Sequence, residues 1–98
     1  MKKAPIPSDE KKRLAAVRAL KLLDTPPEER FDRITRIATQ LFNVPISTIT
    51  LVDKNREWYK SYQGLSEREG DRADSFCGHT ITKKEILVVC DTKQDARF

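Results

Sequence analysis

The segment "SFCGHTI", residues 75–81, places a cysteine and the only histidine of the chain two positions apart. Cys77 and His79 are the side-chain types of a thiol nucleophile and its base. A helix starting at Ser75 would put Cys77 in its first turn, where a helix start lowers a thiol pKa. Residues at i and i+2 of a helix point to different sides, so His79 is badly placed to take the thiol proton. The spacing therefore argues against catalysis.

A metal site is the second chemistry that these side chains suggest. The chain has two cysteines, Cys77 and Cys90, and one histidine. A structural zinc site needs about four ligands and a catalytic site about three from the protein, so carboxylates would have to complete the set. The sequence predicts no metal site. Nothing beyond the pair of cysteines indicates an oxidising compartment, so reduced thiols are expected.

The composition is that of one small domain. The chain has 98 residues, of which 38% are hydrophobic and 35% charged, and a net charge of +4. The whole basic excess lies in residues 1–42, but no aromatic–basic interleaving accompanies it, so solvated helix faces are expected rather than nucleic-acid binding. The longest apolar run, Ile86 to Cys90, is far too short to span a membrane. We expect a cytoplasmic protein with no nucleic-acid or membrane partner.

Two helices are predicted in the first half of the chain, after a flexible lead-in over residues 1–8. Ser8 is expected to cap a helix that runs to about Leu23 and carries two apolar strips, one for its own domain and one for a partner helix. Thr25 and Glu28 are expected to form a capping box at the start of the second helix. That helix has one apolar face, predicted to pack on the domain: Phe31, Ile34, Ile37, Ala38, Leu41 and Phe42. Asn43 fits its left-handed end.

A sheet is predicted in the second half. Residues 46–52 and 57–63 read as two strands of a hairpin. Residues 64–74 read as a polar surface loop, and Ser75 is expected to cap a short helix to about Thr82. Residues 85–91 read as a third strand, central in the sheet because it is apolar on both faces. The fold class is α+β, with an antiparallel sheet and helices packed on one face.

The order of motifs resembles a known family. "LLDTPPEERFDRITRIATQLFNVPISTITLVDKNREWYKSYQGL", "SFCGHTI" and "LVVCDTKQDARF" together are similar to the N-terminal two-thirds of a GAF domain. The subfamily is the one found at the front of bacterial signalling proteins such as histidine kinases and diguanylate cyclases. The resemblance implies a profilin/PAS-related architecture, with helices on one face of the sheet and a small-molecule pocket on the other. It also implies a regulatory, non-catalytic role and dimerisation through terminal helices.

The resemblance covers about residues 14–98 and departs from the family in length. GAF domains usually continue past "DARF" with further strands and a final helix. We therefore expect residues 9–98 to be a partial GAF-like domain, truncated before the last strands and helix. An unpaired strand at a sheet edge favours pairing with another chain. Homodimerisation or self-association through the first helix or the open sheet edge is expected.

The function that the resemblance implies is a sensory module whose ligand state is relayed through dimer helices. The short helix at Ser75 would roof the cavity, with two strands below it. The predicted ligand-binding residues are Thr48, Thr50, Trp58, Phe76, Cys77 and His79. Each also has a simpler interpretation as a packing or hydrogen-bonded residue. The ligand and any cofactor remain open.

Several alternatives follow from the same resemblance. Some GAF-like proteins are thiol enzymes that reduce free methionine sulfoxide, but their cysteine pattern does not match this chain. Covalent bilin attachment would use a cysteine next to a histidine, and here Gly78 intervenes. Haem or iron would depend on a single histidine. Cyclic-nucleotide binding and a ligand-free dimerisation scaffold stay open.

Overall fold

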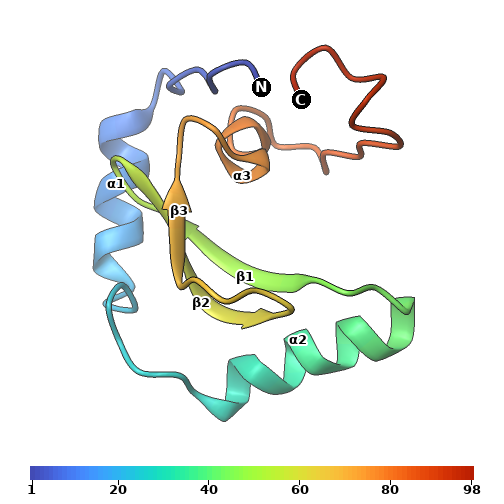
Figure 1. Cartoon of the computed structure of the whole chain (residues 1–98). Helices are drawn as coiled ribbons and strands as arrows, with labels where there is room; N and C mark the ends of the chain where they lie inside the picture. The colour runs from blue at the N-terminus through green and yellow to red at the C-terminus, as the bar shows by residue number, and fades with distance from the viewer.

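The computed structural model describes all 98 residues as three helices and a three-stranded antiparallel sheet in the order β1-β2-β3 (Figure 1). The elements are α1 (Glu10–Ala19), α2 (Glu29–Phe42), β1 (Ser47–Val52), β2 (Arg56–Gln63), β3 (Glu69–Asp71) and α3 (Phe76–Thr80). In the view of Figure 1, α2 lies below the sheet, α3 lies above it, and α1 runs past one end. The α+β class with an antiparallel sheet is as predicted. No helix has both the length and the apolar composition needed to cross a membrane.

The predicted hairpin forms, and it contains a β-bulge. Ile49 of β1 pairs with Ser61 of β2, whereas Thr50 pairs with Tyr59, so Lys60 has no partner on β1. A bulge lets two successive side chains point to the same face of a sheet. Lys60 and Ser61 both point toward α2, and Tyr59 lies on the opposite face.

Lys60 is the most deeply buried long side chain of the protein, only 1% exposed. Its ammonium group donates hydrogen bonds to Thr25 Oγ1 (2.6 Å) and to the Pro26 carbonyl (2.7 Å). It also pairs with Glu28 Oε2 at 2.6 Å. A buried ammonium is tolerated only when it is paired and hydrogen-bonded. Lys60 therefore ties the segment before α2 to the sheet.

The start of α2 differs from the prediction because Lys60 uses the groups that were expected to cap it. The hydroxyl of Thr25 donates to the Leu22 carbonyl and accepts from Lys60, and no side chain caps the helix at Glu28. The predicted capping box is therefore wrong. At the other end, Asn43 is left-handed with a φ of 50°, as predicted.

The face that α2 turns to the sheet is polar. Thr35 is 1% exposed, and its hydroxyl lies 2.9 Å from Ser61 Oγ. Ser61 in turn donates to Asp32 Oδ1 at 2.6 Å, and Gln63 Nε2 donates to Thr35 Oγ1. These hydrogen bonds fix the rotation of α2 about its axis.

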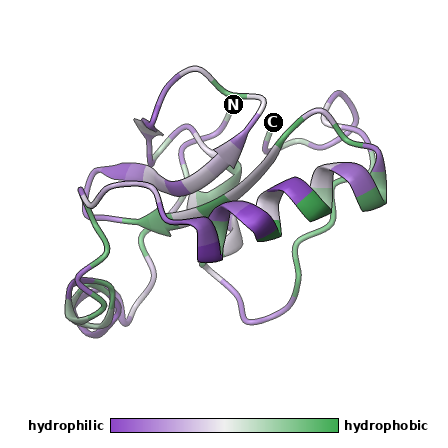
Figure 2. Ribbon diagram, turned by 90° about the horizontal axis from the view of Figure 1, so that it is seen from below, coloured by the Kyte–Doolittle hydropathy of each residue, from purple (hydrophilic) through white to green (hydrophobic).

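The predicted apolar face of α2 is consequently only partly buried. Phe31 and Ala38 are half-buried, but several of its members are more than half exposed: Ile34, Ile37, Leu41 and Phe42. Figure 2, seen from below the sheet, shows hydrophobic residues along the outward surface of α2. The expectation that this whole face packs on the domain is wrong for these four residues.

The first helix is shorter than predicted. It ends at Ala19, and Lys21 has a φ of 55°, so Leu22 and Leu23 lie beyond it. The Ser8 cap is absent: Asp9 precedes the helix and makes no side-chain cap bond. None of the residues of α1 is buried.

Ion pairs and hydrogen bonds of buried or half-buried arginines connect α1 to the rest of the domain. Arg13 donates to the Val52 carbonyl at the end of β1 and pairs with Glu10 at 2.8 Å. Arg72, 3% exposed, pairs with Glu10 and donates to the carbonyls of Asp53 and Lys54. Arg72 and Arg13 hold the pKa of the Glu10 carboxyl at about 2. These contacts join α1, the β1–β2 turn and the segment before α3.

Two further predictions about the sheet are wrong. Its third strand is Glu69–Asp71, inside the predicted loop, and it pairs with Arg56–Trp58 of β2. Residues 85–91 form no strand, and Ile86 is 90% exposed. Strand composition alone does not make a strand, because each strand needs a neighbour to complete its backbone hydrogen bonds.

The lead-in over residues 1–8 lies against α3 without forming a helix or strand. The Lys2 N–H donates to the Arg97 carbonyl and the Ala4 N–H donates to the Ala73 carbonyl, both at 2.8 Å. The two chain ends are therefore close together, as Figure 1 shows. The flexibility expected for this segment stays a prediction.

The buried ammonium group yields a test of stability. We expect Lys60→Met to lower the free energy of unfolding by about 2 kcal/mol, because Thr25, Pro26 and Glu28 lose their shared donor. Urea unfolding at neutral pH measures this. Lys12→Met, an exposed change on α1, should stay within about 0.5 kcal/mol. A Lys60→Met protein as stable as the wild type would contradict the role given to Lys60.

Candidate functional site

The helix α3 is placed over the sheet by local hydrogen bonds. Ser75 Oγ accepts from the Gly78 N–H at 2.9 Å and donates to the Arg72 carbonyl at 2.6 Å, so the predicted Ser75 cap is confirmed. Gly78 is required by close packing. A Cβ there would lie 2.4 Å from the Arg72 carbonyl oxygen and 2.9 Å from Ala4 Cβ. Through these contacts α3 packs closely against the lead-in and the segment that follows the sheet.

A cavity of about 300 Å³ lies between α3 and the upper face of the sheet. It is lined by residues of four segments: Ile46, Thr48, Glu57, Tyr59, Leu65, Phe76 and Cys77. Thr48 Oγ1 lies 2.9 Å from Thr50 Oγ1 on the same strand, and the Tyr59 ring lies 6.3 Å from that of Tyr62. The volume is at the small end of the range for ligand cavities, about 300–1,000 Å³.

Glu57 supplies the charge of this cavity. Its carboxylate accepts a hydrogen bond from the Tyr59 hydroxyl and takes part in none of the ion pairs of the protein. None of the seven lining residues is basic. Burial, together with the hydrogen bond to Glu57, raises the pKa of Tyr59. The Tyr59 side chain therefore stays neutral at physiological pH.

Cys77 is a protonated thiol in this setting. Burial first, and then the negative charge and hydrogen bond of Glu57, raise its pKa to about 11, although Thr50 acts in the opposite direction. An activated thiol needs a lowered pKa and an electropositive neighbourhood. The surroundings of Cys77 are apolar and negative, so its chemistry is that of a neutral wall residue.

His79 points away from this cavity. Its Nε2 lies 3.1 Å from the Lys2 carbonyl oxygen, and its ring packs edge-on against Phe98 at 5.0 Å. The structure thus separates His79 from Cys77 on α3, as the i, i+2 spacing predicted. The His79 ring therefore contacts the lead-in, and it does not face the cavity that Cys77 lines.

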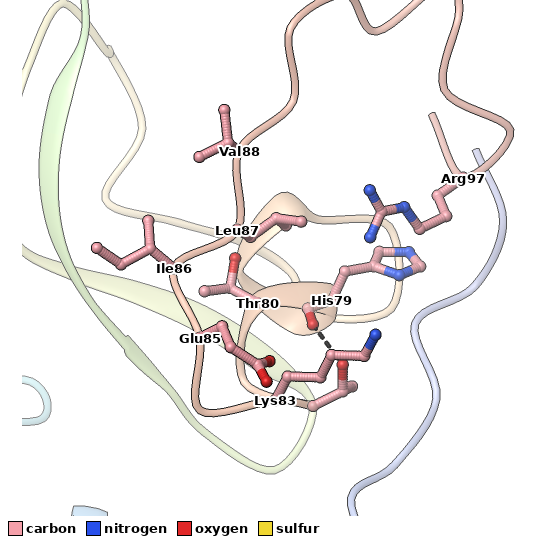
Figure 3. Close-up of a pocket in the computed structure, with 9 residues that line it drawn as sticks. His79, Thr80, Lys83, Glu85, Ile86, Leu87, Val88 and Arg97 are labelled. Carbon is pink, nitrogen blue, oxygen red and sulfur yellow. Dashed lines mark hydrogen bonds between the residues drawn. The ribbon is translucent and has the colours of Figure 1, made fainter.

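A second cavity, of about 340 Å³, lies on the His79 side of α3 (Figure 3). Its walls are Thr80, Thr82, Lys83, Glu85, Ile86, Leu87, Val88, His79 and Arg97. Arg97 is already paired with Asp95 at 2.6 Å, and Val88 is 72% exposed. Of the six predicted ligand-binding residues this hollow holds His79 alone, whereas the cavity under α3 holds Thr48, Phe76 and Cys77, so it is the weaker candidate.

Trp58 lies on the face of the sheet opposite the α3 cavity. It is 3% exposed, and the Arg68 guanidinium stacks on its ring at 4.8 Å. Arg68 also donates to the Thr25 carbonyl at 2.8 Å. Trp58 therefore packs next to the segment before α2.

The structure brings part of the predicted site together. Thr48, Phe76 and Cys77 line the α3 cavity. Thr50 lies behind this wall, and its hydroxyl is hydrogen-bonded to two of the lining residues, Thr48 and Cys77. Trp58 and His79 lie elsewhere. No group of three or more histidine, cysteine, aspartate or glutamate side chains is arranged to hold a metal ion.

Sequence reasoning missed four cavity residues: Ile46, Glu57, Tyr59 and Leu65. The alternation of β2 was a usable signal, because Thr50 and Tyr59 are opposite each other in the hairpin and share a face. If Thr48 and Thr50 face the cavity, the alternation of β2 places Glu57 and Tyr59 on the same face and Trp58 on the opposite one.

Comparison with known sequences identifies the family of this chain. A sequence model of the GAF domain family matches residues 26–98. The chain belongs to the GAF domain family. The match covers the segment before α2, the sheet and α3, so the cavity of this GAF domain lies wholly inside the matched region.

One curated relative is a bacterial phosphodiesterase. The chain is 39% identical over 94 residues to the protein described as cyclic di-GMP phosphodiesterase PA2567 of Pseudomonas aeruginosa. The alignment covers 96% of this chain and 16% of that protein. The chain therefore corresponds to a small part of its relative.

The environment of Cys77 yields a test of reactivity. Because its pKa is about 11, we expect iodoacetamide to modify Cys77 slowly at neutral pH, with a rate that rises until the pH approaches 11. Peptide mass spectrometry across a pH series measures this, with the exposed Cys90 as internal comparison. A rate at Cys77 that levels off near pH 7 would show an activated thiol.

Proposed function

We propose that this GAF domain is a non-catalytic sensory module of a bacterial signal-transduction protein in the cytoplasm, and that it binds a small molecule under α3. The observation that carries the proposal is the cavity itself. It combines apolar walls with a few converging polar groups, which is the usual composition of a ligand site. The similarity to part of a cyclic di-GMP phosphodiesterase supports a place in signalling.

A regulatory rather than catalytic role is supported by what the polar groups do. Cys77 is a neutral thiol without a base, and His79 is engaged on the other side of α3. A thiol enzyme would need these two groups within hydrogen-bonding reach of one another. The cavity residues are instead suited to holding a ligand.

The relay that we propose runs through the lead-in. One side of α3 faces the cavity with Phe76 and Cys77, and the other side contacts the lead-in at Lys2 and Ala4. The lead-in continues directly into α1. A ligand that favours one position of α3 would thereby shift the population of α1 arrangements.

In this proposal, the arrangement of α1 controls self-association of the protein. None of the residues of α1 is buried, Leu20 at its end is 55% exposed, and β1 is an edge strand of the sheet. A homodimer through α1 would place the relay at the subunit interface. The free edge of β1 is the second surface available for pairing.

The ligand cavity is tested by native mass spectrometry of the protein purified from cells. We expect a bound small molecule that is lost in Leu65→Trp, which fills the α3 cavity. The matched control Leu87→Trp fills the second cavity and should keep the ligand. Loss in the control alone would move the site to the second cavity. A wild-type protein that carries no ligand, and that no metabolite in a thermal-shift screen stabilises, would contradict the proposal.

The dimer is tested by sedimentation equilibrium. We expect the wild type to self-associate and Leu20→Glu to raise the dissociation constant tenfold or more, because a charge replaces an interface leucine. Leu41→Glu, which changes the exposed surface of α2 (72% exposed at this position), should leave it unchanged. A monomeric wild type at high concentration would rule out self-association. If Leu41→Glu raised the dissociation constant and Leu20→Glu did not, the α1 interface would be ruled out.

A further inference from the structure

The α3 cavity has an electrostatic character that the rest of the protein does not share. The chain carries a net charge of +4, yet Glu57 is the single acidic residue among those that line the cavity, and no basic residue lines it. Cys77 and Tyr59, the other titratable side chains of its wall, have raised pKa values and stay neutral. No lysine, arginine or histidine pairs with the Glu57 carboxylate.

The remaining walls are apolar and partly open to solvent. Ile46 is 51% exposed and Phe76 is 47% exposed, so both present surface to an incoming molecule, and Leu65 completes the apolar rim. An aromatic ring attracts a cation that lies over its face. A carboxylate and an aromatic wall in one small cavity are therefore complementary to a positive group on an apolar body.

We propose that the ligand of this cavity is a small organic amine, bound as its ammonium ion, with its charge on Glu57 and its apolar part against Phe76, Ile46 and Leu65. This inference rests on the proposed function, because it assumes that the cavity binds a ligand. The Thr48 and Thr50 hydroxyls are nearby acceptors for the remaining ammonium protons.

The same geometry disfavours anionic ligands. A phosphate or carboxylate in this cavity would meet the Glu57 carboxylate at short range and find no basic side chain in the wall. Among the alternatives that the family resemblance left open, a cyclic nucleotide with its phosphate in this cavity is the least compatible.

Three probes of matched shape test the ligand class. They are 2-phenylethylamine, 2-phenylethanol and 3-phenylpropionate, titrated into the full chain and followed by chemical shifts of Thr48, Tyr59 and Cys77. We expect the amine to bind about tenfold more tightly than the alcohol, the size of effect that one charge-assisted hydrogen bond gives, and the carboxylate to bind least. Raising the salt concentration should weaken only the amine.

Glu57→Gln is expected to remove the preference for the amine while the alcohol still binds. Asp9→Asn is the matched control, because it removes the same charge from an exposed position at the start of α1 and should leave all three affinities unchanged. If Glu57→Gln does not fold, the salt dependence of amine binding in the wild type still tests whether a charge on the cavity wall holds the amine.

The outcomes separate the two proposals. Equal binding of amine and alcohol, a salt-independent amine, or an unchanged preference in Glu57→Gln overturns the amine inference and leaves the ligand cavity standing. Failure of the amine to shift the cavity residues at millimolar concentration also overturns the amine inference, whereas the ligand cavity itself is decided by the native mass spectrometry and the thermal-shift screen.

Discussion

Lys60 is the residue on which the arrangement of the fold depends. It is the extra residue of the β2 bulge, and its buried ammonium group binds the segment that leads into α2. Because the bulge adds one residue, Lys60 and Ser61 both face α2, while Tyr59 faces α3. Without it, strict alternation would turn Ser61 toward α3. The bulge at Lys60 thus leaves one face of the sheet packed against α2 and the other face lining the cavity under α3.

The parts of this fold that could be predicted are those with local signals. The hairpin follows from its β-branched strand, the α3 start from Ser75, and the end of α2 from Asn43. The rotation of α2 could not be predicted, because it is set by hydrogen bonds between Thr35 and Ser61 whose positions depend on the bulge. A hydrophobic pattern identifies an apolar face, but not whether that face finds a covering surface.

The candidate site shows the same division between local and distant information. Phe76 and Cys77 lie at the cavity, where the expectation of a short roofing helix placed them. Glu57 was missed, although it gives the cavity its charge, because its importance depends on which face of β2 the roof covers. His79 was assigned to the cavity because the whole of α3 was expected to roof it, whereas residues two positions apart on a helix point to different sides. Its partner, the Lys2 carbonyl, is 77 positions away.

The contacts of the first residues have a consequence for how such domains are delimited and expressed. The family match begins at Pro26, yet Lys2 and Ala4 bind the far side of α3, and Glu10 pairs with the buried Arg72. A recombinant fragment cut at the matched boundary would leave Arg72 without its carboxylate and Gly78 uncovered. The span that a family model matches and the set of residues that pack together in one member are then different lengths of chain, and in this protein residues before the match contact the helix that roofs the cavity.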